Sequence, residues 1–184
     1  MKHPSNREFF AYWDNKRGDA RAPDRGDIEP GAVRELLGDI FVLSYDHDAG
    51  HPFRVAGTRI SALLGRDPRE RSFSALFAAE SRGEIDDIIC YVAEETLAAV
   101  GGITATSDNG TDTHLELLLL PFNPRAHSPI SLTGLLAPFE SNLTTLRDFR
   151  LTSWRYLHRP EKLVPQALRK LAIARGFMVY EGLR

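Results

Sequence analysis

The chain has 184 residues, of which 42% are hydrophobic and 26% are charged, and its formal net charge is −2. This composition predicts one globular domain with a short appendage. It excludes a wholly disordered chain and a pair of full-sized domains.

Nothing in the sequence predicts secretion or a membrane anchor. The only cysteine, Cys90, cannot form an internal disulfide, so no oxidising compartment is required. The opening residues MKHPSNREFF become polar too early for a signal peptide, and no apolar run approaches the roughly 20 residues of a membrane span. We therefore expect a cytoplasmic protein.

The charge is unevenly distributed along the chain. Residues 1–146 contain 14 Lys and Arg against 22 Asp and Glu, whereas residues 147–184 contain 9 against 3. The basic C-terminal segment can dock on its own acidic domain or on a second copy, or it can bind an external anionic partner. Both alternatives remain open at this point.

The first predicted element is a short helix rich in aromatic residues. Ser5 and Glu8 form a capping-box pattern, and the helix is expected to end at Gly18. Its apolar residues cover too wide an arc for a solvated helix. We expect it either to cap a sheet or to form a dimer contact through Phe9, Phe10 and Trp13.

An irregular segment, RAPDRGDIEP, separates this helix from two predicted strands. A short helix over residues 30–37 would begin at Pro30 and end at Gly38. DIFVLSYD and HPFRVAG then have the composition of strands joined by a short loop. In the second strand, the two-residue repeat predicts that Phe53 and Val55 share one face.

Helical elements follow over residues 58–100. Thr58 is the predicted N-cap of a helix that ends at Gly65, and SFSALF adds an apolar turn. A longer helix begins at Ser81, carries apolar residues at helical spacing, and is expected to end at Gly101 and Gly102. Cys90 lies within this apolar pattern, which favours an inert core residue over a nucleophile.

Three more strands are predicted after the long helix. ITATS is joined by the hairpin signal Asn109-Gly110 to HLELLLLPF, and PISLTGLLAPF follows. Leu115, Leu117 and Leu119 lie on one face of the middle strand, and its other face becomes apolar only toward the end. We expect a central strand that is covered on one side and partly covered on the other.

The C-terminal segment predicts an irregular stretch followed by a basic amphipathic helix. Pro165 would lie in the first turn of this helix. Leu168, Leu171 and Ala172 would form its apolar face, and Arg169, Lys170 and Arg175 its basic face.

Several of these segments, taken in order, resemble stand-alone bacterial PAS domains. The matching segments are YWDNKRG, RAPDRGDIEP, LLGDIFVL, FRVAGTRISALLGRD and LELLLLPF, between Phe10 and Pro138. The resembling group opens with a Tyr-Trp helix and an Arg-x-Pro-x-Arg segment. The chain departs from it at Gly38, where many relatives have proline, and in the basic segment after residue 146.

The resemblance implies an α+β fold with a five-stranded antiparallel sheet and helices on one face. It divides the chain into an N-terminal helix (1–18), a PAS-like domain (19–140) and a basic C-terminal extension (141–184). It also implies a sensor or interaction module in bacterial signalling, with a partner protein, dimerisation through a helix outside the core, and a small ligand between sheet and helices.

The residues expected around such a ligand are largely apolar, and Tyr91 would add a polar group. They are Phe41, Leu43, Phe53, Val55, Leu64, Phe73, Leu76, Phe77, Ile88, Ile89, Tyr91, Val92, Leu117, Leu119 and Leu132. The same residues are also consistent with a closed core, because protein interiors pack densely.

No cofactor, metal site or enzyme activity is expected. His47, His51, His114 and His127 do not pair at the spacing of a metal or haem site. Flavin photochemistry in PAS relatives uses a cysteine just before the long helix, whereas Cys90 lies inside it. No nucleophile motif and no glycine-rich phosphate loop is present.

One motif supports a different class of function. Arg21 and Arg25 fit the Arg-x-x-x-Arg pattern with which PilZ domains bind cyclic dinucleotides, although the companion Asp/Asn-x-Ser-x-x-Gly element is absent. The main hypothesis is a non-enzymatic, homodimeric PAS sensor or adaptor. The alternative is a protein that binds a nucleic acid, a cyclic dinucleotide or a membrane surface through these arginines or through the basic C-terminal segment.

Overall fold

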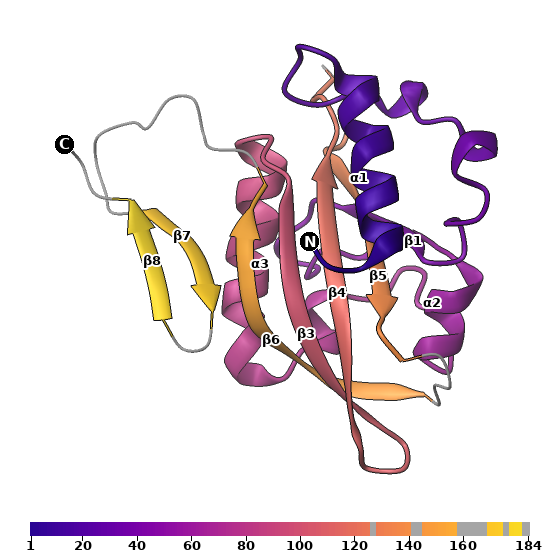
Figure 1. The fold of residues 1–184 in the computed structure, drawn as a ribbon, viewed down its shortest axis with the longest axis vertical. Coiled ribbons are helices and arrows are strands. Elements are labelled where there is room, and N and C mark those ends of the chain that lie inside the picture. Colours follow the sequence, from indigo (N-terminus) through magenta and orange to yellow (C-terminus); the bar gives the residue numbers. More distant parts are fainter. Residues whose placement is uncertain (126–127, 141–144, 158–168, 175–176, 182–184) are drawn as a thin grey trace.

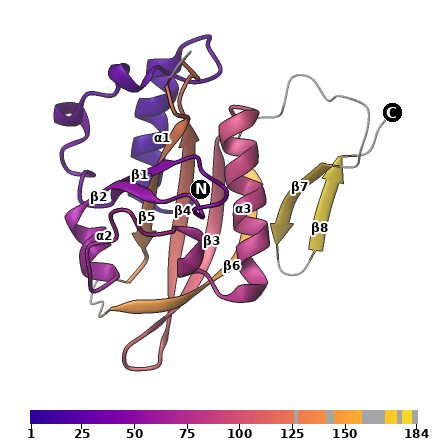
Figure 2. The ribbon, with the colours of Figure 1, turned by 180° about the vertical axis from the view of Figure 1, so that it is seen from behind.

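In the computed structural model, the chain forms an antiparallel sheet with helices on both faces (Figures 1 and 2). The structure describes residues 1–125, 128–140, 145–157, 169–174 and 177–181. The helices are α1 (Pro4–Arg17), α2 (Thr58–Leu63) and α3 (Ala79–Glu94), with short 3-10 helices η1 (Arg25–Asp27), η2 (Pro30–Val33) and η3 (Ser74–Leu76). In this part of the chain, no helix combines the length and apolar character needed to cross a membrane.

The sheet contains the five predicted strands and three further ones. The strands are β1 (Ile40–Ser44), β2 (Phe53–Ala56), β3 (Ala99–Ser107), β4 (Asp112–Pro121), β5 (Ser131–Pro138), β6 (Leu146–Tyr156), β7 (Arg169–Ala174) and β8 (Phe177–Glu181). Their spatial order is β2-β1-β5-β4-β3-β6-β7-β8. The predicted α+β fold with a five-stranded antiparallel sheet is therefore confirmed in the part from β2 to β3.

The leucine run of β4 is divided between two cores. Leu115, Leu117 and Leu119 lie in the inner core, where α2, α3 and η3 cover the sheet. Leu118 and Leu120 lie in the outer core, beneath α1. Side chains alternate across a strand, so consecutive leucines are the expected composition of a strand that is buried on both faces.

The inner layer is built by α3, whose apolar residues recur at helical spacing as predicted. Ile85, Ile88, Ile89 and Val92 are buried against the sheet. In Figure 2 this helix lies in front of β6 and beside β3, on the opposite face from α1. The sheet thus separates two apolar layers.

The outer layer is α1, which lies across β4 and β5 in Figure 1. The N-cap lies two residues before Ser5, the N-cap of the predicted capping box. His3 is the N-cap, and its Nδ1 accepts a hydrogen bond from the backbone N–H of Ser5 at 3.2 Å. Ser5 is therefore inside the helix.

The long helix ends earlier than predicted. Helix α3 stops at Glu94, and Thr96 follows with a positive φ of 57°. Gly101 and Gly102 are not a helix end but lie inside β3. A Cβ on Gly101 would lie 3.1 Å from Leu151 Cδ1 and 3.3 Å from the carbonyl oxygen of Ser153, so the close approach of β6 favours glycine there.

Two shorter helices also differ from the predictions. The segment expected as a helix over 30–37 forms only η2, followed by turns, because its few residues provide too little apolar surface for a longer helix. Helix α2 begins at Thr58 itself, and Gly57 is its N-cap.

The C-terminal predictions were wrong for the residues that the structure describes. Residues 152–156, expected to be irregular, belong to β6, which lies beside β3. Arg169–Ala174, expected to be part of a basic helix, is β7, which pairs with β6. Pairing with an available sheet edge overrides a weak local helical pattern. Pro165 and Leu168 lie outside the described residues.

Candidate functional site

The space between the sheet and helices α2 and α3 contains most of the predicted pocket residues. Twelve of them belong to the inner core, namely Phe41, Leu43, Phe53, Leu64, Phe73, Phe77, Ile88, Ile89, Val92, Leu117, Leu119 and Leu132. Leu76 is partly buried against this core. Strand β6 adds Phe149 and Trp154, which the sequence analysis did not include.

Phenylalanine rings run through the centre of this core. The ring of Phe73 lies 5.3 Å from that of Phe41, 5.5 Å from that of Phe53 and 5.4 Å from that of Phe77, measured between centroids. Phe77 in turn lies 6.0 Å from Phe149. These are the separations of packed aromatic pairs, so the middle of the layer is filled by side chains.

Two predicted pocket residues point elsewhere. Val55 is 48% exposed, because the register between β1 and β2 shifts between Val42 and Leu43. Phe53 pairs with Leu43 and Val55 with Val42, which leaves Arg54 as the extra residue of a bulge and turns Val55 to the outer face. Tyr91 is exposed on the flank of α3, where its ring contacts Tyr156.

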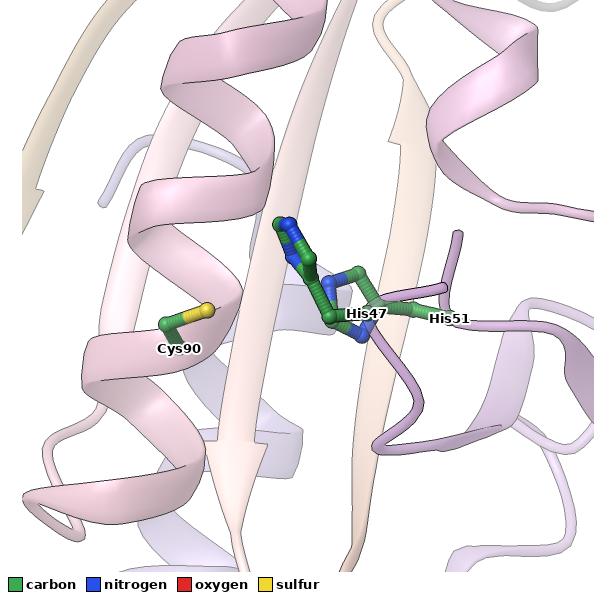
Figure 3. Close-up of side chains that lie close together, drawn as sticks. All are labelled: His47, His51 and Cys90. Atoms are coloured by element: carbon green, nitrogen blue, oxygen red, sulfur yellow. The ribbon is translucent and has the colours of Figure 1, made fainter. Parts of the chain in front are cut away.

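A polar cluster lies at one edge of the inner core. The turn between β1 and β2 brings His47 and His51 toward Cys90 on α3, and their possible ligand atoms all lie within 4.8 Å of one another (Figure 3). Tyr45 stacks on His51 with ring centroids 5.5 Å apart. The sequence analysis did not join these residues, since only the fold brings Cys90 beside a distant turn.

His51 is the unusual member of this cluster. Its side chain is 0% exposed, yet neither ring nitrogen has a hydrogen-bond partner. It has a positive φ of 56°, and the preceding Gly50 has a φ of 67°. Two successive left-handed residues close the turn and direct the imidazole inward. Burial lowers the pKa of His51, so the ring is neutral at neutral pH.

Two carboxylates and two hydroxyl groups lie near this cluster. Asp86, one helical turn before Cys90, has its carboxylate 3.7 Å from His51 Nε2 and accepts a hydrogen bond from the Ser74 hydroxyl. The Tyr45 hydroxyl donates to Glu94, and this hydrogen bond raises the pKa of Tyr45. Cys90 is half-buried and free rather than enclosed in the core.

Helix α1 is held on the outer face at both ends by β4. Near its start, the buried Glu116 accepts hydrogen bonds from the backbone N–H groups of Lys2 (2.6 Å) and His3 (2.9 Å) and from Asn6 Nδ2 (3.0 Å). Near its end, the Trp13 indole N–H donates to the carbonyl oxygen of Pro121 at 3.0 Å.

This arrangement settles what α1 does in the conformation described. Phe9 is 0% and Trp13 1% exposed, so neither is available as a dimer contact, and Phe10 is half-buried beside them. In this structure α1 covers the second apolar face of β4, which is the sheet-cap alternative. The predicted dimer contact does not fit the buried side chains of Phe9 and Trp13.

The two arginines of the Arg-x-x-x-Arg motif are not brought together in one site. Arg25, Arg54 and Arg125 line a hollow of about 290 Å³, whereas Arg21 is exposed outside it. Arg125 pairs with Asp24 at 2.9 Å and holds the pKa of that carboxyl below its usual value. Within the described residues, Arg25 and Arg54 form no ion pair.

Of the other two histidines considered as metal ligands, the one that the structure describes does not join the cluster. His114, on β4, is exposed beside Glu140, with 3.5 Å between Nδ1 and the carboxylate. His127 lies outside the described residues.

The chain was compared with solved structures and with known sequences. Among solved structures, the LOV domain of a blue-light activated histidine kinase from Erythrobacter litoralis has 11% identity and a TM-score of 0.44, with 58% of this chain and 99% of that chain covered. A light-oxygen-voltage domain studied with a flavin analogue has 10% identity and a TM-score of 0.47, with 60% and 84% covered. An RsLOV variant has 10% identity and a TM-score of 0.46, with 77% and 72% covered.

The sequence comparisons give one match. No curated protein matches the chain. A family model described as PAS domain matches residues 1–137, which include α1, α2 and α3, strands β1 to β4, and β5 except for its last residue.

Proposed function

The chain belongs to the PAS domain family, and from this membership we propose that it is a non-enzymatic sensor or adaptor module of bacterial signalling that acts through protein–protein contacts. The signal would be a change of packing in the inner core, caused by a small apolar ligand or by a partner protein. The readout would be the docking of α1 on the outer face. The observation that carries this proposal is the division of the β4 leucines between the two cores.

The physical basis of the coupling is that neighbouring residues of β4 face opposite layers. Leu117 and Leu119 pack in the inner core, and Leu118 between them packs in the outer core. A shift of β4 that accommodates a ligand on one face must move the surface on which α1 rests. A ligand changes this equilibrium only as far as it favours one packing over the other.

Hydrogen exchange tests the coupling. Phe73→Leu alters only the inner core, and we expect it to accelerate exchange of the α1 amides. The reference is the unmodified protein in enough urea to give the same global free energy of unfolding, so that global opening contributes equally to both. Identical α1 exchange in the two samples would show that the faces are independent and would remove the proposed readout.

The division into an N-terminal helix, a PAS-like domain and a C-terminal extension stays a prediction, although β6 of the extension pairs within the same sheet. The homodimer, the bacterial origin, the cytoplasmic location and the absence of enzyme activity also stay predictions. Native mass spectrometry of the purified protein would report copy number and any retained small molecule together.

A second candidate function is favoured by the hollow between Arg25, Arg54 and Arg125. Two guanidinium groups that lack an ion pair and lie in one hollow could bind the phosphates of an anionic ligand such as a cyclic dinucleotide. The residues that would act are then Arg25 and Arg54 rather than Arg21 and Arg25.

Charge-reversal variants distinguish binding by Arg25 and Arg54 in the hollow from binding by the sequence motif Arg21 and Arg25. If a cyclic dinucleotide binds, we expect Arg25→Glu and Arg54→Glu each to weaken its affinity by roughly tenfold or more, because each removes a charged hydrogen-bond donor. Arg21→Glu is the matched control and should leave the affinity unchanged. Calorimetric titration at two salt concentrations measures both effects. If Arg21→Glu weakened the affinity as much as Arg25→Glu does, the result would contradict binding in the hollow.

A further inference from the structure

The cluster of His47, His51 and Cys90 has the composition of a metal site. Imidazole nitrogens and a thiolate are the ligands that Zn²⁺ takes in proteins, and three protein ligands with a water in the fourth position form a common zinc geometry. The three side chains come from two elements that are far apart in sequence, the β1–β2 turn and α3 (Figure 3).

The buried imidazole of His51 is an independent indication of a ligand. A buried polar group without a hydrogen bond costs free energy, and the large majority of buried side-chain polar atoms in proteins have a hydrogen-bond partner. Neither nitrogen of His51 has a hydrogen-bond partner although the side chain is 0% exposed. A metal ion bound to one nitrogen would satisfy a group that forms no hydrogen bond within the protein.

The surroundings of His51 also fit a metal ligand. The Asp86 carboxylate lies 3.7 Å from His51 Nε2, and carboxylates beside a metal-bound histidine orient its ring in many zinc sites. His47 is exposed, which leaves the cluster open to solvent for entry of the ion and for a bound water. Tetrahedral Zn²⁺ places ligand atoms roughly 3.3–3.8 Å apart, so rotation of His47 and Cys90 has to close the present separations of up to 4.8 Å by about 1 Å.

We propose that His47, His51 and Cys90 bind one Zn²⁺ ion, which ties the β1–β2 turn to α3. Binding converts the Cys90 thiol to a thiolate and releases its proton to solvent, with no change of oxidation state. Asp86 positions the His51 ring. The site goes beyond the signalling role proposed above and does not depend on it.

The experiment uses the full chain, freed of any affinity tag and stripped with a chelator. Zn²⁺ affinity is measured by competition with a chromophoric chelator, and Co²⁺ is added separately as a spectroscopic probe of thiolate ligation. We expect one Zn²⁺ per chain and a thiolate-to-cobalt absorption band. His47→Ala and Cys90→Ser should each weaken Zn²⁺ binding by roughly tenfold or more, since loss of an indirect partner already costs that much.

Controls keep the outcome clear. His114→Ala removes an exposed histidine outside the cluster and should change the Zn²⁺ affinity less than twofold. Because His47 is exposed, His47→Ala should fold normally, and its unfolding midpoint without metal verifies this. Absence of one-equivalent binding, or binding that survives both His47→Ala and Cys90→Ser, would overturn the site. Either failure would leave the coupling between the two faces of the sheet untouched.

Discussion

Replacement of Trp13 by alanine is expected to lower the free energy of unfolding by about 3–5 kcal/mol. The indole is 1% exposed, packs in the outer core, and donates its N–H to the carbonyl oxygen of Pro121 at 3.0 Å. Alanine would remove the largest side chain of this layer and leave that carbonyl without its partner. Such a loss is a large part of the stability of an ordinary domain, roughly 5–15 kcal/mol.

Urea unfolding followed by far-ultraviolet circular dichroism measures this change. Phe10→Ala is the matched control on the same helix, because Phe10 is half-buried and stacks on Trp13 with a centroid separation of 6.0 Å. Its effect should be clearly smaller. A Trp13→Ala cost below about 1 kcal/mol would mean that α1 does not rest on the sheet in solution.

The same variant separates the two roles considered for α1. If α1 served mainly as a dimer contact, the substitution would convert dimers to monomers and leave the free energy of unfolding of each chain unchanged. A sheet cap loses stability in the single chain, whatever its oligomeric state. Sizing chromatography beside the unfolding measurement therefore distinguishes the two roles.

The central sheet could be predicted because its sequence patterns are local and strong. One buried face of β4 is indicated by Leu115, Leu117 and Leu119. Burial of the opposite face is indicated by Leu118 and Leu120. The spacing of Ile85, Ile88 and Val92 likewise predicts the buried face of α3. In each case the residues of a single strand or helix are enough to predict which face is buried.

Features that depend on a partner strand could not be predicted in this way. Val55 lies two residues after Phe53, so regular alternation along a strand would place both side chains on the same face. The bulge at Arg54 places them on opposite faces. In β6, the buried residues Phe149 and Trp154 are not an even number of residues apart, because the register with β3 shifts between Gly102 and Ile103. A two-residue pattern interrupted by bulges has no clear signature in one sequence.

The polar cluster was missed for a related reason. His47 and His51 lie four residues apart in a turn, where metal-site spacings from helices do not apply. Their nearness to Cys90 arises when the β1–β2 turn meets α3. A search for histidine pairs next to a glycine that favours a left-handed turn, such as Gly50, would have identified His47 and His51. It would not have identified Cys90 on α3 as the third member.

Gly134→Ala is expected to lower the free energy of unfolding by about 2–3 kcal/mol through overpacking. Gly134 lies in β5, opposite Phe41 of β1 and Leu119 of β4. A Cβ there would lie 2.4 Å from Phe41 Cζ and 2.6 Å from the carbonyl oxygen of Leu118. Thermal and urea unfolding measure the change, and its sign is informative, since alanine stabilises an open position by about 0.5–1 kcal/mol.

The matched control is Gly83→Ala in α3, where an added Cβ meets nothing within 4 Å and φ is not positive. This substitution should stabilise the protein. The contrast then reports on the inner core, because relief of the clash at Gly134 requires movement of the Phe41 ring as well as of the Leu118 carbonyl. Phe41 is enclosed by Phe53 and Phe73 at centroid separations of 5.7 and 5.3 Å, which predicts the full cost. A cost below about 1 kcal/mol would mean that the ring has space to enter, which favours a ligand cavity over a closed core.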